Sequence, residues 1–74
     1  MVKELDTVAL VSDLPKHGLK AGDIGAVVMV HQNPVGYEVE FVTLSGETVA
    51  VVSLIPGQVR EIGKREIANA RLVA

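Results

Sequence analysis

The alternation of apolar and polar residues is clearest in the middle of the chain. Tyr37, Val39 and Phe41 share one face of an extended segment, whereas Glu38 and Glu40 share the other, because successive side chains of a strand point to opposite sides. This pattern predicts a half-buried antiparallel strand whose two aromatic rings fill the core.

Four more strands are predicted from short runs of β-branched residues that turn residues separate. They cover residues 5–11, 24–31, 48–54 and 59–62. The last follows Pro56-Gly57, where a single 3₁₀ turn leads into the strand. Gln32 to Gly36 and Leu44 to Glu47 have turn chemistry. About five short strands with tight turns predict an all-β fold, a barrel or sandwich.

A long loop from Ser12 to Asp23 separates the first two predicted strands. Asp13 is placed to accept hydrogen bonds from nearby backbone amides, which predicts an irregular loop that is held in place by such bonds. Gly25, just after the loop, indicates a bulge or a close approach of two backbones.

The last residues have an ambiguous pattern. Lys64 to Arg71 contains good helix formers, yet every second residue from Ile67 to Val73 also fits one side of an added strand. We therefore predict a barrel over residues 1–62 and a tail over residues 63–74, which packs on the barrel or on a partner as an extra strand or a short helix.

Residues 27–30 and 49–52 are apolar on both faces of their predicted strands. Either the tail and the long loop cover the outer side, or a subunit or partner protein does. The second possibility predicts a partner-binding set that combines these strands with the tail. Its members are Val27, Met29, Val49, Val51, Arg65, Ile67 and Arg71.

Composition narrows the class of protein. A chain of 74 residues holds one small core, and the absence of cysteine excludes disulfides and thiolate metal sites. No stretch reaches the roughly 20 apolar residues that cross a bilayer, and residues 1–6 are charged, so we expect a cytoplasmic protein without a membrane partner. Residues 1–57 carry three lysines and seven acidic residues, a charge of −4, whereas residues 58–74 carry four basic and two acidic residues, a charge of +2.

No residue pattern indicates an enzyme. Glu38 and Glu40 stand about 7 Å apart on one strand face, as paired carboxylates do in glycosidases, but so small a barrel lacks a deep cleft. Ser12, Ser45 or Ser53 would need a histidine oriented by an acid to become a nucleophile. We expect no catalytic residue.

Cofactor and metal sites are also not indicated. His17 and His31 fit no ligand spacing, even with Asp13 or Asp23 beside them. Gly22 and Gly25 precede a strand rather than the helix that a phosphate site needs. We expect no cofactor and no metal.

Several segments together resemble a known family. They are Leu5–Val8, Gly18–Gly25 followed by Val27-Val28, Tyr37–Phe41 and Gly46–Val51, in order between Lys3 and Arg60. The chain resembles the bacterial family of domain of unknown function 4926. The resemblance implies an SH3-like barrel without an assigned activity, often encoded beside a second small protein, as in toxin–antitoxin pairs.

These observations predict a non-catalytic protein-interaction module, with the neutralising role in a bacterial toxin–antitoxin-like pair as one form. Its partner is a second copy, giving a homo-oligomer, or a protein encoded nearby. The alternative is an RNA-binding barrel similar to KOW domains, which would use Lys16, Lys20 and the tail arginines. The acidic barrel and the scarcity of aromatic residues make nucleic acid the minority alternative.

Overall fold

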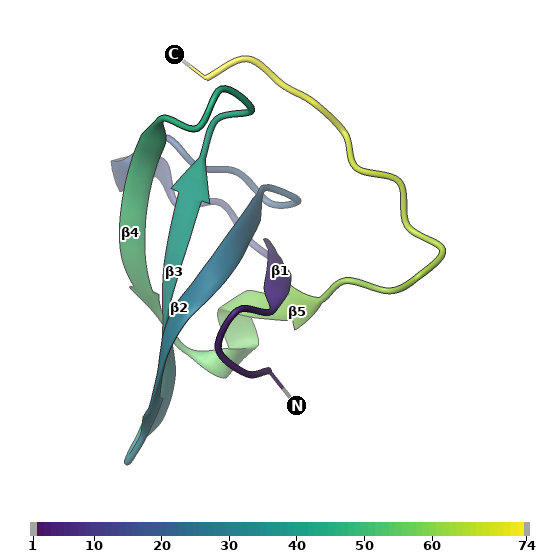
Figure 1. The fold of residues 1–74 in the computed structure, drawn as a ribbon. Coiled ribbons are helices and arrows are strands. Elements are labelled where there is room, and N and C mark those ends of the chain that lie inside the picture. Colours follow the sequence, from purple (N-terminus) through teal and green to yellow (C-terminus); the bar gives the residue numbers. More distant parts are fainter. Residues whose placement is uncertain (1, 74) are drawn as a thin grey trace.

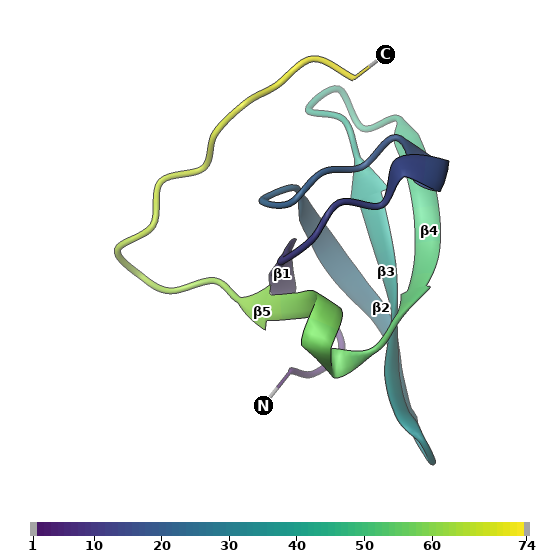
Figure 2. The same ribbon diagram turned by 180° about the vertical axis from the view of Figure 1, so that it is seen from behind.

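Five antiparallel strands form one twisted sheet in the computed structural model, which describes residues 2–73 (Figures 1 and 2). Met1 and Ala74, the outer ends of the two predicted domain ranges, lie outside the described residues. The strands are β1 (Thr7–Leu10), β2 (Ile24–Gln32), β3 (Val35–Val42), β4 (Thr48–Leu54) and β5 (Val59–Glu61). Their order in the sheet is β4-β3-β2-β1-β5.

The strands occur where the sequence pattern places them. β4 has the predicted bounds, whereas β2 and β3 extend farther than predicted and leave only Asn33 and Pro34 as their turn. The 3₁₀ turn η2 (Pro56–Gln58) leads into β5, which pairs with β1 at the far side of the sheet. The all-β fold class is therefore confirmed, with a small barrel-like arrangement.

The long loop between β1 and β2 is held by backbone and side-chain hydrogen bonds. It contains the 3₁₀ turn η1 (Pro15–His17) and a β-bridge between Leu14 and Leu19. Asp13 Oδ1 accepts the backbone N–H of Ala21 at 2.9 Å, as predicted for a tethered loop. Leu19 is buried in the core, so the loop also closes one side of the barrel.

One hydrophobic core lies on the inner side of the sheet. Tyr37, Val39 and Phe41 of β3 are all buried, which confirms the predicted alternation. Every other strand and the long loop contribute to the same core. The remaining members are Val8, Leu10, Leu19, Val27, Val52, Leu54 and Val59.

The tail differs from its prediction. Residues 63–73 form neither a strand nor a helix but leave β5 as a wide arch (Figure 1). A helix there would be shorter than the about 12–15 residues that an isolated helix needs, and it would have no packed face, because Ile67 is 95% exposed.

None of the helices in the described residues is long and apolar enough to cross a membrane.

Candidate protein-binding face

A β-bulge decides which residues of β2 reach the surface. Val27 pairs with Val39 but Met29 pairs with Glu38, so Val28 is an extra residue. Val27 is fully buried, whereas Val28 and Met29 are 43% and 50% exposed. The prediction that Val27 belongs to a partner-binding surface is wrong, because the extra residue shifts the alternation by one position.

A second bulge lies in β4. Phe41 pairs with Ala50 and Val42 pairs with Thr48, which leaves Val49 as the extra residue. Val49 is half-buried and packs against the core, so it does not present an open apolar surface. Val51, two residues farther, is 55% exposed.

We call the solvent side of β2, β3 and β4 the outer face. It carries exposed apolar side chains and two half-buried carboxylates. These residues are Val28, Met29, Val42 and Val51, with Glu38 and Glu40 between them. Because Val28, Met29 and Val51 remain about half exposed, neither the tail nor the long loop covers this face.

Short hydrogen bonds hold both glutamates of the outer face. Ser53 Oγ donates to Glu38 Oε1 at 2.7 Å, and His31 Nε2 lies 2.8 Å from Glu38 Oε2. Thr48 Oγ1 donates to Glu40 Oε2 at 2.8 Å. The bond from Ser53, followed by the one from His31, lowers the pKa of Glu38, so this carboxylate is ionised at neutral pH.

The arrangement of Ser53, Glu38 and His31 does not activate a nucleophile. In a catalytic triad the serine donates its proton to the histidine, and the acid stands behind the histidine. Here Glu38 lies between the other two, and Ser53 donates to the carboxylate. The three side chains fix a surface charge in place, and the low pKa of Glu38 does not suit a general acid.

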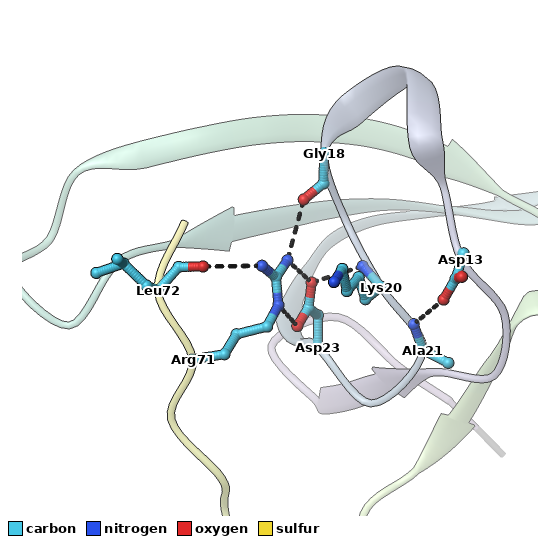
Figure 3. Close-up of polar contacts among 7 residues, drawn as sticks. All are labelled: Asp13, Gly18, Lys20, Ala21, Asp23, Arg71 and Leu72. Carbon is cyan, nitrogen blue, oxygen red and sulfur yellow. Dashed lines mark hydrogen bonds and ion pairs between the residues drawn. The ribbon is translucent and has the colours of Figure 1, made fainter. Parts of the chain in front are cut away.

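The tail contacts the long loop through one arginine (Figure 3). Arg71 Nε donates to Asp23 Oδ1 at 2.7 Å, and a terminal guanidinium nitrogen donates to Asp23 Oδ2 at 2.5 Å. That nitrogen also donates to the Gly18 carbonyl at 3.0 Å. Asp23 additionally accepts the backbone N–H of Lys20 at 2.8 Å, so the loop presents a preformed acceptor to the tail.

The three predicted tail residues have different surroundings. Arg71 binds the long loop, whereas Arg65 and Ile67 lie in the exposed arch. No hydrogen bond or ion pair joins these residues to the outer face within residues 2–73. The structure therefore does not join the two halves of the predicted binding set into one surface.

The two histidines have different surroundings. His17 is exposed in η1, and His31 is bound to Glu38. No group of three His, Cys, Asp or Glu side chains in the described part of the chain is placed to hold a metal ion.

A family model for a domain of unknown function matches residues 4–61, which include all five strands. The chain belongs to this family, DUF4926. The resemblance that we proposed over Lys3 to Arg60 is thus confirmed, and the DUF4926 match ends before the tail. No curated protein and no solved structure matches this chain. The SH3-like assignment and the bacterial origin stay predictions.

Breaking the contact between the tail and the loop is expected to change the titration of one carboxyl group. The hydrogen bond from Arg71 is the main cause that lowers the pKa of Asp23 below 3.8. We expect Arg71→Gln to raise this pKa, as measured by NMR titration, and Arg60→Gln to leave it unchanged, because Arg60 pairs with Glu66 instead.

The same contact gives a small pH dependence of stability. Because the folded pKa of Asp23 is depressed, its contribution is present above the unfolded pKa and is lost as the pH falls through the folded value. A partly exposed ion pair contributes about 1 kcal/mol or less, so acid is expected to release the tail without unfolding the sheet. A pKa of Asp23 that did not respond to Arg71→Gln would contradict this contact.

Proposed function

We propose that this DUF4926 domain is a non-catalytic protein-interaction module that binds a second, separate protein on its outer face. The observation that carries the proposal is the exposure of Val28 and Met29 beside carboxylates that already have hydrogen-bond partners. Burial of such side chains against a partner is worth about 25 cal/mol for each Å² of apolar surface removed from water.

The charges of the outer face favour a particular kind of partner. Glu38 and Glu40 keep their bonds to Ser53 and Thr48 while a partner docks, so only part of their hydration is lost. The net charge of residues 1–57 is −4, from three lysines and seven acidic residues. A partner with apolar side chains surrounded by Lys or Arg would complement this surface.

The family resemblance supports a partner encoded nearby. DUF4926 members are expected beside a second small protein, and a neutralising role in a toxin–antitoxin-like pair fits a small domain that binds without catalysis. We therefore propose that the domain has this neutralising role and that it acts in the cytoplasm of a bacterium.

The KOW-like RNA-binding alternative depends on the tail arginines and on Lys16 and Lys20. Arg60 and Arg71 are paired with Glu66 and Asp23, which reduces the positive charge they offer to phosphates. Protein binding is therefore the better-supported function.

Co-expression with the protein encoded next to this chain tests the proposal. We expect the two to purify as a complex, and Met29→Asp to weaken it at least tenfold, because a charge would be buried at the interface. Val11→Asp is the matched control, since Val11 is similarly exposed but lies in the loop after β1.

Two results would count against the proposal. One is a complex whose affinity falls equally with Met29→Asp and Val11→Asp. The other is binding of a mixed-sequence RNA, with steep loss of affinity as salt rises, in place of protein binding.

A further inference from the structure

The two edge strands of the sheet differ in how well they are protected against pairing with strands of other chains. β5 is three residues long and carries Arg60 and Glu61, and short, charged edge strands resist pairing with other chains. β4 is seven residues long, with the sequence Thr-Val-Ala-Val-Val-Ser-Leu. It contains no charged residue and no proline, so of the usual protections of an edge it has only the bulge at Val49, near its start.

The free side of β4 offers backbone groups for pairing. β4 pairs with β3 on one side, and no strand of residues 2–73 pairs with its other side. None of the loop and turn backbone bonds within the described residues involves residues 48–54. A row of N–H and C=O groups therefore remains along this edge, and β4 is the outermost strand of the sheet on its side (Figures 1 and 2).

From these features we infer that β4 pairs with β4 of a second copy, antiparallel and about a two-fold axis at Val51. Val51 is the middle residue of the strand, with three residues on each side. The axis places Val51 opposite Val51 of the second copy and Ala50 opposite Val52. Because the strand is uncharged along its whole length, this register brings no like charges together.

Self-pairing also explains the exposed position of Val51. Its side chain is 55% exposed in one copy, and the two-fold axis brings it against its equivalent on the outer side of a continuous sheet. Pairing of β4 leaves Met29 on β2 uncovered, since β3 lies between the two strands. The self-pairing edge is thus separate from the part of the outer face around Met29.

Single cysteines test this register directly, because the chain contains no cysteine. Directly opposite residues of two antiparallel strands have Cβ atoms about 4.5–5.5 Å apart, close enough for a disulfide after a small adjustment. Under mild oxidation we expect Val51→Cys to give a covalent dimer and Met29→Cys, which is similarly exposed, to remain a single chain.

Light scattering of the uncross-linked chain provides the second measurement. We expect the unchanged protein and Met29→Lys to have the mass of two chains, and Val51→Lys to associate at least tenfold more weakly, because two ammonium groups would meet at the axis. Should Val51→Lys fail to fold, the cysteine pair still decides the question.

A single-chain mass for the unchanged protein at all concentrations would overturn the inference, and so would equal cross-linking at positions 51 and 29. A single-chain protein that still bound the neighbouring protein would refute self-pairing alone and leave the proposed function intact.

Discussion

Val27→Asp is expected to unfold the domain, whereas Val28→Asp is expected to leave it folded. Val27 is fully buried among the core residues, and an unpaired carboxylate there costs several kcal/mol. The total stability of a chain this size is about 4–11 kcal/mol, so this cost removes most of it. Val28 is 43% exposed, and its carboxylate would stay in water at a cost of about 1 kcal/mol.

Urea unfolding followed by circular dichroism measures both free energies of unfolding. The two positions are adjacent valines in one strand, so each variant is the control for the other. Equal losses of stability would contradict the placement of Val27 in the core and of Val28 on the solvent side of β2.

Gly25→Ala is expected to destabilise the fold by about 3 kcal/mol, at the upper end of the usual cost of overpacking. A Cβ at this position would lie 2.6 Å from Val39 Cγ1 and 2.8 Å from Phe41 Cε1. Both side chains are buried and surrounded by the core, so neither can move away without displacing others. The Glu40 carbonyl oxygen, 3.0 Å away, adds a backbone contact that cannot yield easily.

Gly57→Ala is the matched control for this prediction. No atom lies within 4 Å of a Cβ at Gly57, and its φ is not in the left-handed region. We expect its free energy of unfolding to stay within about 1 kcal/mol of the unchanged chain. A Gly25→Ala protein as stable as Gly57→Ala would show that the contact between β2 and β3 has room for a methyl group.

Most of the sheet could be predicted because its signals are local. The alternation of apolar and acidic residues from Tyr37 to Phe41 predicts which face of β3 is buried. The uninterrupted run of uncharged, mostly β-branched residues from Thr48 to Leu54 predicts the bounds of β4. Gly25 indicated a bulge or a close backbone approach. The approach is real, whereas the bulge lies three residues later at Val28.

The bulges could not be located from the sequence. Val27, Val28, Met29 and Val30 are all apolar, so no polar residue marks where the alternation shifts. Of the two possibilities for the outer side, cover by the tail and the long loop does not occur, and the predicted binding set placed Val27 on the wrong side of the sheet. Only the pairing with β3 shows which valine is the extra one.

The contact of Arg71 with Asp23 joins residues 48 positions apart, beyond any local pattern. The sequence shows a basic tail and an acidic barrel, but not which carboxylate accepts the guanidinium. A strand or helix was expected for the tail because propensity is local, whereas the structure gives the arch no surface to pack on.

Oxidation of Met29 by dilute peroxide is the most direct test of the outer face as a protein-binding surface. Met29 is half exposed, and peptide mass spectrometry separates its sulfoxide from that of Met1, the other methionine. In a complex of verified mass with the neighbouring protein, we predict that Met29 oxidises several-fold more slowly than in the chain alone. An unchanged rate in that complex would show that the partner binds elsewhere.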